Sequence, residues 1–461
     1  MIPQRSIEEI SAIVGPAHLS TREENLAHYG TDGTKQCFLP DAVAFPGTAE
    51  EISHILRLAN RDDFPVIPRG AGSGKSGGAL PVRGGLVLAM ERLDRILVVD
   101  PHNFVARVEP GVITAHLQRE VENLGLFYPP DPASIHISTI GGNVAHCAGG
   151  LRAVKYGVTR DYVLGLTVVL PTGEIIRTGV ETVKGVVGYD LTRLIVGSEG
   201  TLAVITSITL RLIPKPACTR TMVAFFRDAS HTVSAVSRIL RNRIVPTALE
   251  FMDRLCMDCV KEEIGLSIPP DSGAMLLIEV DGEEQPTAGE AEKIREVCLR
   301  GGATQFLAAS GQQEAERLWE ARRNVSPSVY RLRPDKVSED IVVPRTRLPE
   351  LVFFLEELGE SSGLPVPAYG HAGDGNIHVN IMFDPENPEE RARVEPTVRS
   401  LFRKVLEMGG TLSGEHGVGL TKAPYVGMEI SSSSLQLMAR IKKAFDPKGI
   451  LNPGKILPQS T

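Results

Sequence analysis

Three histidines near the end of the chain, His371, His378 and His416, lie in two glycine-rich segments. The first segment runs from Gly370 to Asn380, and the second runs from Gly409 to Gly419. Glycine lets backbone and ligand approach one another closely, so imidazoles and carboxylates set among glycines predict a ligand site. We therefore ask which chemistry these side chains can perform and which elements bring them together.

A metal site is one chemistry that these residue types support. His371 and His378 are seven residues apart, so a continuous strand would place them on opposite faces. The glycines between them could turn the chain and bring both imidazoles to one point. Glu415 would then complete a set of two histidines and one carboxylate, which suits zinc, manganese or iron. Asp374 could orient one imidazole. The alternative, histidines hydrogen-bonded within a tight turn, stays open.

Composition limits the classes of protein that need to be considered. The chain has 461 residues, enough for two or three domains. Its net charge of -7 and the lack of a long basic run argue against a nucleic-acid partner. The first residues show no signal-peptide pattern, and the apolar runs are too short to span a bilayer. We expect a cytoplasmic protein that attaches to a membrane, if at all, through a partner.

The six cysteines are scattered along the chain, which is typical of reduced thiols in the cytosol. Cys256 and Cys259 form a lone C-x-x-C in an expected helix, and we interpret them as packing residues. The sequence lacks the four grouped thiolates that an iron–sulfur cluster normally needs.

Residues 69–78 form a loop with five glycines after an expected short strand. Gly72 to Gly77 matches the G-x-G-x-x-G dinucleotide pattern, and Gly74-Lys75-Ser76 matches the end of a P-loop. Both motifs require a helix immediately afterwards, and Gly77-Gly78-Ala79-Leu80-Pro81 cannot supply one. The loop therefore predicts a cradle of backbone amides for a pyrophosphate, without a Rossmann fold.

The expected elements divide the chain into three parts. Residues 1–37 predict a helical arm. Residues 38–216 alternate short strands and helices and include a hairpin at Pro171-Thr172-Gly173. Residues 217–461 predict an antiparallel sheet with helices on one face. The tail, residues 440–461, is expected to return to the preceding domain.

Several further segments carry specific patterns, and together they identify a family. They are P-R-G-A-G-S-G from Pro68, S-T-I-G-G-N-V-A from Ser138, G-S-E-G-T-L-A-V-I-T from Gly197, G-H-A-G-D-G-N-I-H-V-N from Gly370, G-E-H-G from Gly414 and F-D-P-K-G-I-L-N-P-G-K from Phe445. In this order the set resembles the FAD-dependent 2-hydroxyacid dehydrogenases of the vanillyl-alcohol-oxidase-type superfamily. The resemblance covers about residues 38 to 457. It is strongest to the group of the glycolate oxidase D-subunit, D-lactate dehydrogenase and D-2-hydroxyglutarate dehydrogenase.

The resemblance implies an α+β flavoprotein of two domains. One is a PCMH-type FAD-binding domain, and the other is an FAD-linked oxidase C-terminal domain for substrate and metal. Covalent relatives attach the flavin through a histidine at the place of Ser73, so the resemblance implies non-covalent FAD here. His146 departs from the family pattern, and the sequence leaves open whether it packs or contacts flavin. The residues expected to contact FAD are Pro68, Arg69, Gly70, Ala71, Gly72, Ser73, Gly74, Ser76, Pro130, Asp131, Ser138, Thr139, Gly141, Gly142, Asn143, Ala145, Gly149, Gly200, Ile205 and Asn452.

The resemblance also implies roles at the substrate. Arg322, or its neighbour Arg323, would bind the substrate carboxylate, because arginine presents a planar fork. Histidine titrates near neutral pH, so His416 is the candidate general base. Alternatively, His416 would be a third metal ligand. The implied reaction oxidises a D-2-hydroxyacid (D-lactate, glycolate or D-2-hydroxyglutarate) to the 2-oxoacid, with hydride transfer from Cα to flavin N5. Further substrate contacts are expected from Ser326, Lys336 and Asn380.

The reduced flavin needs an electron acceptor, and the chain has no cluster of its own. The resemblance therefore implies a partner: an iron–sulfur subunit, an electron-transferring flavoprotein, a cytochrome or quinone. The oligomeric state stays open, a homodimer included. Two other functions also stay open: a superfamily member that uses FAD without net oxidation, as alkyl-ether lipid synthases do, and a non-catalytic electron-transfer flavoprotein.

Overall fold

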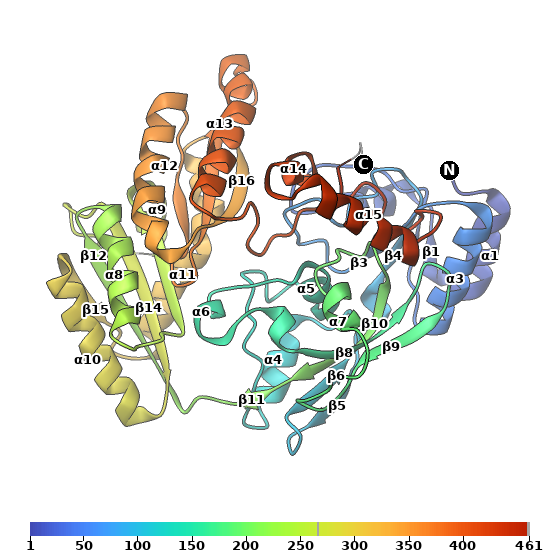
Figure 1. The fold of residues 1–461 in the computed structure, drawn as a ribbon, viewed down its shortest axis with the longest axis horizontal. Helices are drawn as coiled ribbons and strands as arrows, with labels where there is room; N and C mark the ends of the chain where they lie inside the picture. Colours follow the sequence, from blue (N-terminus) through green and yellow to red (C-terminus); the bar gives the residue numbers. More distant parts are fainter. Residues whose placement is uncertain (265–266, 459–461) are drawn as a thin grey trace. The chain divides into compact units, whose positions relative to one another are not determined.

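The computed structural model describes residues 1–264 and 267–458. These residues fold into two compact units. The first unit comprises Met1–Gly149, Val158–Lys215 and Glu415–Thr461, and the second comprises Gly150–Gly157 and Pro216–Gly414. The last three residues of the predicted tail, 459–461, lie outside the described residues. The fold is α+β, and Figure 1 shows the red C-terminal segment among the blue and green elements of the first unit.

The first unit contains a four-stranded sheet in the order β1-β2-β4-β3. Strands β2, β4 and β3 are parallel, and β1 pairs with β2 in the antiparallel sense. Leu451 forms an isolated parallel bridge with Val66 of β3, so the end of the chain returns to this unit. The bounds are β1 Leu19–Ser20, β2 Ala42–Ala44, β3 Val66–Arg69 and β4 Leu86–Ala89, with helices α1 Gln4–Val14, α2 Glu23–Tyr29, α3 Ala49–Asp62, α14 Val426–Glu429 and α15 Ser432–Phe445.

A five-stranded antiparallel sheet in the order β5-β6-β10-β8-β9 completes the first unit. Strands β8 and β9 pair directly through the turn that the sequence predicted, so the predicted hairpin is confirmed. Two short strands, β7 and β11, pair separately. The bounds are β5 Ile96–Asp100, β6 Val105–Val108, β7 Leu126–Phe127, β8 Val163–Val169, β9 Ile175–Gly179, β10 Val204–Arg211 and β11 Ile213–Pro214, with helices α4 Thr114–Glu122, α5 Ile140–His146 and α7 Leu191–Ile195.

The second unit is built on a seven-stranded antiparallel sheet in the order β15-β12-β14-β13-β17-β18-β16. Strands β17 and β18 form a hairpin around the predicted His371–His378 segment. The bounds are β12 Cys218–Phe226, β13 Ala248–Asp253, β14 Ala274–Gly282, β15 Ala303–Ala308, β16 Asp335–Val342, β17 Ala368–His371 and β18 Asn376–Phe383.

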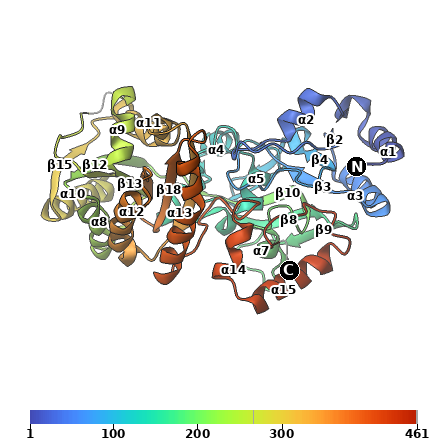
Figure 2. The ribbon, with the colours of Figure 1, turned by 90° about the horizontal axis from the view of Figure 1, so that it is seen from above.

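Helices cover both faces of this sheet, so the expectation of helices on one face is wrong. Figure 2 shows α9 and α11 on one side of the sheet and α8 and α12 on the other. Met257 of α9 and Trp319 of α11 pack with Met252 and Leu277 of the sheet in one apolar cluster. No helix in the described ranges is long and apolar enough to cross a membrane. The bounds are α6 Ala153–Tyr156, α8 Ala229–Arg241, α9 Arg254–Ile264, α10 Glu284–Arg300, α11 Gln312–Ser328, α12 Leu348–Ser362 and α13 Pro388–Glu407.

Candidate active site

A cavity in the first unit is lined by the glycine loop that follows β3, by α5 and the residues before it, and by the turn that leads into β10. No helix follows β3 directly, which confirms that the dinucleotide and P-loop patterns are coincidental. The predicted FAD residues that line the cavity are Pro68, Arg69, Gly70, Ala71, Gly72, Ser73, Gly74, Ser138, Thr139, Gly141, Gly142, Asn143, Ala145, Gly200 and Ile205.

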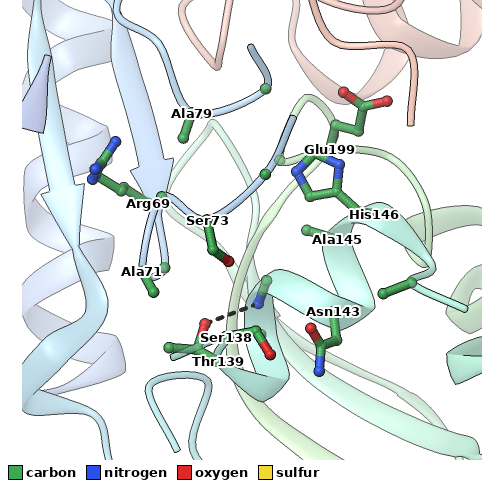
Figure 3. Close-up of a pocket in the computed structure, with 18 of the residues that line it drawn as sticks. Arg69, Ala71, Ser73, Ala79, Ser138, Thr139, Asn143, Ala145, His146 and Glu199 are labelled. Atoms are coloured by element: carbon green, nitrogen blue, oxygen red, sulfur yellow. Dashed lines mark hydrogen bonds between the residues drawn. The ribbon is translucent and has the colours of Figure 1, made fainter. Parts of the chain in front are cut away.

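Hydrogen bonds hold the α5 segment in shape. The Thr139 hydroxyl caps α5 by accepting a hydrogen bond from the Gly142 amide at 3.2 Å (Figure 3). Asn143 Nδ2 donates to Thr114 Oγ1 at 2.7 Å, and that hydroxyl lies 3.0 Å from Ser138 Oγ. A Cβ on Gly70 would lie 2.4 Å from Thr139 Oγ1, so only glycine lets the two segments approach this closely. Thr114 is buried, and no sequence pattern indicated its role.

Glu199 ties the β10 turn to the second glycine-rich segment. Its carboxylate accepts hydrogen bonds from the amides of Val418 and Gly419, each at 2.7 Å. Asn452 joins this network because its Nδ2 donates to the carbonyls of Gly78 and Glu199, at 2.8 and 2.7 Å. Asn452 is thus bonded to two residues that line the cavity, Gly78 and Glu199, but does not line the cavity itself.

Four other residues predicted to contact FAD also lie outside the cavity lining. The carbonyl of Ser76 accepts hydrogen bonds from Leu420 and Thr421. The carbonyl of Pro130 accepts from Gln118, and Asp131 is buried beside it. Gly149 lies against Glu415.

His146, Glu415 and His416 do line the cavity. The structure places His146 at the wall of the cavity. Figure 3 shows the His146 imidazole near the Glu199 carboxylate at the cavity wall. The general-base candidate and one predicted metal ligand therefore belong to the same unit as the predicted FAD site.

The second unit presents a row of polar side chains on one face of its sheet. Strand pairing aligns His378 with Asp340 of β16 and with Tyr369 of β17, and it aligns His371 with Glu250 of β13. Because side chains alternate between faces along a strand, these residues share one face with Asn376, Asn380, Ser338 and Lys336.

His371 and His378 meet on this face. Their Nε2 atoms lie 3.4 Å apart, and both side chains are buried. His371 Nδ1 lies 2.7 Å from Glu250 Oε1, which assigns the Nδ1 proton to that bond and turns Nε2 toward His378. Two converging imidazoles, one of them held by a carboxylate, form a donor set that fits a divalent cation. The carboxylate of Asp374, proposed as an orienting group, accepts a hydrogen bond from the Asn376 amide.

Arg322 projects from α11 into the same buried region. Its Nε and Nη2 both lie 2.7 Å from Glu250 Oε2, and its guanidinium stacks 4.7 Å from the centre of the Tyr369 ring. Arg323 is exposed. Burial raises the pKa of the Glu250 carboxyl, but His371 and Arg322 outweigh that effect and hold the pKa below its ordinary value.

Lys336 and Ser326 also lie together, since Lys336 Nζ donates to the Ser326 carbonyl at 2.9 Å and approaches its hydroxyl at 3.2 Å. Ser338 donates to Asn380 Oδ1 at 3.1 Å. Asp340 is fully buried and accepts hydrogen bonds from Asn376 Nδ2 at 2.6 Å and from the Gly414 amide at 3.0 Å. The second unit thus gathers the predicted residues Ser326, Lys336 and Asn380 with Arg322, His371 and His378.

Two family models match this chain. The model described as "FAD binding domain" matches residues 40–179, and "FAD linked oxidases, C-terminal domain" matches residues 215–456. The second match alone covers more than half of the sequence. The chain belongs to the FAD-linked oxidase family.

Named relatives align with this FAD-linked oxidase over nearly its whole length. It is 42% identical to glycolate oxidase subunit GlcD of Bacillus subtilis over 99% of this chain and 97% of the relative. It is 35% identical to D-lactate dehydrogenase of Anaerostipes hadrus over 90% of this chain and 89% of that one. p-Cresol methylhydroxylase shares its fold, with a TM-score of 0.83 at 18% identity over 100% of this chain and 98% of that chain. The oxidase is an FAD-dependent oxidoreductase of the vanillyl-alcohol-oxidase type.

Sequence patterns did not single out two acidic residues of the oxidase. Glu250 stands in the largely apolar strand Ala248–Asp253, and Glu199 stands in the G-S-E-G segment from Gly197, where it was assigned no role of its own. A carboxylate inside a buried strand needs charged or hydrogen-bonding partners. The acidic residue within an apolar strand pattern could therefore have indicated a functional role for Glu250. The packing interpretation of Cys256 and Cys259 agrees with the structure, because both side chains are buried in one apolar cluster.

Proposed function

We propose that this FAD-linked oxidase oxidises a small D-2-hydroxyacid, such as D-lactate, glycolate or D-2-hydroxyglutarate, to the 2-oxoacid. One observation carries the proposal: two buried histidines converge on one face of the sheet of the second unit, and the carboxylate that holds His371 also holds Arg322. Lys336, which bonds to Ser326, lies further along the same face. Cationic groups beside a candidate metal site suit a substrate with adjacent carboxylate and hydroxyl groups. The names of the glycolate oxidase and D-lactate dehydrogenase relatives support the same class.

Each side chain then has a role. Glu250 occupies the Nε and Nη2 side of Arg322, so the substrate carboxylate would approach Nη1. The exposure of Arg323 favours Arg322 for this task. Lys336 and Ser326 would add hydrogen bonds to the carboxylate, and Asn380 would orient the hydroxyl. His416 would accept the hydroxyl proton on a ring nitrogen, which is the task of a general base.

FAD and a divalent cation supply the rest of the chemistry. Bound FAD, held non-covalently with Ser73 in the glycine loop, supplies the two-electron acceptor. We propose that His371, His378 and Glu415 hold a zinc, manganese or iron ion that would lower the pKa of the substrate hydroxyl. Chain connectivity supports the inclusion of Glu415, since Gly414, the residue before it, bonds to Asp340 on the polar face.

Anaerobic flavin bleaching tests the proposal. Addition of D-lactate, glycolate or D-2-hydroxyglutarate to the holoenzyme should abolish the visible flavin absorbance as the flavin is reduced, and L-lactate should do so more slowly. A flavin that stays oxidised with every hydroxyacid would refute the proposed reaction. That result would favour a superfamily member that uses FAD without net oxidation or an electron-transfer flavoprotein.

We also propose that the electrons pass to a partner redox protein or quinone. The six cysteines are scattered along the sequence, which does not offer the four grouped thiolates that an iron–sulfur cluster normally needs. Six cysteines, none of them in a disulfide, also support the cytoplasm as the proposed location. A relative that is named as a subunit supports an assembly with other chains.

A further inference from the structure

We propose that Glu250 is the positioning residue of the site: one carboxylate that orients the metal-binding histidine His371 and the substrate-binding arginine Arg322 at the same time. This inference rests on the proposed function, because it assumes a cation at His371 and His378. Glu250 is fully buried, and each of its oxygens has a different partner. Oε1 lies 2.7 Å from His371 Nδ1, and Oε2 lies 2.7 Å from both Nε and Nη2 of Arg322.

Strand register explains the first of these contacts. Glu250 of β13 is paired directly with His371 of β17. Directly opposed residues have Cβ atoms about 5 Å apart, which a glutamate and an imidazole can bridge with one hydrogen bond. From Ala248 to Met252 the other residues of β13 are apolar, and Leu249, Phe251 and Met252 are all buried. A carboxylate at this position costs free energy unless charged or hydrogen-bonding partners compensate for its burial, and Arg322 and His371 are such partners.

The bond to Glu250 determines what His371 offers to a cation. A neutral imidazole has one N–H and one bare nitrogen. A carboxylate can only accept, so His371 must donate from Nδ1, which leaves Nε2 bare. That bare Nε2 faces His378 Nε2 at 3.4 Å. An amide at position 250 could instead donate to Nδ1 and move the proton to Nε2, where it would block a metal bond.

The second oxygen gives Glu250 its link to substrate. Arg322 has two constraints, the Glu250 carboxylate and the Tyr369 ring at 4.7 Å, and Tyr369 in turn lies 5.3 Å from the His378 ring, centre to centre. The metal ligands and the substrate arginine therefore share one buried polar assembly. A substitution at Glu250 should therefore weaken the binding of both the cation and the substrate. If Glu250 only stabilised the fold, its substitution would lower stability without a specific loss of either affinity.

Glu279 provides a matched control. It lies on the neighbouring strand β14, is partly buried, and accepts a hydrogen bond from Trp319 Nε1 at 2.8 Å. It is paired with Ala248, so it shares the sheet face of Glu250, but its carboxylate accepts hydrogen bonds from Thr221 and Trp319 instead of from a predicted ligand. Glu279→Gln thus reports the general cost of neutralising a partly buried acid on this face of the sheet.

The experiment measures Zn²⁺ affinity of the metal-stripped flavoprotein by competition with a fluorescent chelator, without substrate. We expect Glu250→Gln to bind Zn²⁺ about 10- to 100-fold more weakly than wild type, the usual effect of removing a carboxylate that orients a metal-bound histidine. Glu279→Gln should stay within about threefold. In steady-state assays Glu250→Gln should also raise KM, and Glu250→Asp, which keeps the charge on a shorter side chain, should recover part of both losses.

Wild-type Zn²⁺ affinity in a folded Glu250→Gln protein would overturn the inference, and so would a wild-type protein that binds no Zn²⁺. If Glu250→Gln does not fold, Glu250→Asp takes its place, and its unchanged Zn²⁺ affinity would overturn the inference equally. Failure of the proposed function is a separate result. If Glu250→Gln binds Zn²⁺ more weakly but no hydroxyacid bleaches the flavin of the wild-type holoenzyme, the positioning role of Glu250 is supported and the proposed oxidation is refuted.

Discussion

His371 Nε2 lies 3.4 Å from His378 Nε2 across a β-hairpin. The separation of seven residues would place the two side chains on opposite faces of a continuous strand, but the turn between β17 and β18 pairs His371 with Asn376 and so aligns both histidines on one face. Replacement of either histidine by alanine should remove one of the proposed metal ligands. We expect His371→Ala and His378→Ala each to lose bound metal, measured by elemental analysis of the purified flavoprotein.

His231→Ala is a suitable control for these variants, because His231 is exposed on α8 and pairs with Asp228. The control should keep the metal content of wild type, and all three variants should keep FAD, which we assign to the other unit. Full metal content and activity in His371→Ala would show that the ligand assignment is wrong.

Asn452 should be essential to the stability of the first unit. Its Nδ2 donates to two carbonyls, those of Gly78 and Glu199, and the residue is 1% exposed. Asn452→Asp replaces the donor with a carboxylate oxygen that faces both carbonyls. Leaving such groups unsatisfied costs about 1–3 kcal/mol each, and more for a charge. We expect a lower melting temperature and loss of FAD on gel filtration.

Asn123→Asp is the matched control for that change, since Asn123 is exposed at the C-terminal end of α4. A new negative charge there costs up to about 1 kcal/mol. Equal melting temperatures for Asn452→Asp and Asn123→Asp would contradict a structural role for the Asn452 amide.

The sequence predicted the glycine loop and the histidine hairpin because both depend on local spacing. Ser73, Thr139 and Asn143 line one cavity, as their motifs indicated. Asn452 belongs to a recognisable segment, but its side chain bonds to backbone carbonyls, and a motif cannot distinguish a cofactor contact from support behind the cavity wall.

Residues whose roles depend on distant strand pairing could not be predicted. Glu250 and His371 are far apart in sequence, and only the register of β13 against β17 brings them together. Helix placement on both faces of the second sheet was missed for a related reason. Helical periodicity shows which side of a helix is apolar, but it does not show which face of a sheet the helix covers.

Gly149 should be required for the conformation of Glu415. A Cβ at position 149 would lie 2.8 Å from Glu415 Oε2 and 3.2 Å from Glu415 Cβ. We expect Gly149→Ala to displace this carboxylate and to lower kcat by at least about tenfold through misplacement of a metal ligand. FAD content should be unchanged, because Gly149 is not among the residues that line the cavity.

Gly427→Ala provides the comparison, since a Cβ at Gly427 would meet no atom within 4 Å. Its activity should match that of wild type. A fully active Gly149→Ala protein would show that Glu415 tolerates displacement and would weaken its assignment as a metal ligand.

Lys455 should make the stability of the protein depend on pH above neutrality. Burial lowers the pKa of its ammonium group to about 8, against the opposing attraction of Glu199 and Asp32. The side chain is 4% exposed, and Nζ donates to the Leu80 carbonyl at 2.6 Å. An unfolded lysine has a pKa of about 10.4, so between these values the unfolded state binds more protons than the folded state. The free energy of unfolding therefore rises with pH in this window.

Lys455→Met removes the titrating group and isolates this effect. The stability of wild type relative to Lys455→Met should increase by up to about 3 kcal/mol between about pH 8 and pH 10.4, since each unit of pKa difference corresponds to about 1.4 kcal/mol. Urea unfolding followed by circular dichroism at about pH 7, 8.5 and 10 measures the difference. Exposed Lys184 offers a control, and Lys184→Met should follow wild type at every pH. Parallel stability curves for wild type and Lys455→Met would mean that Lys455 does not titrate in this window in the folded protein.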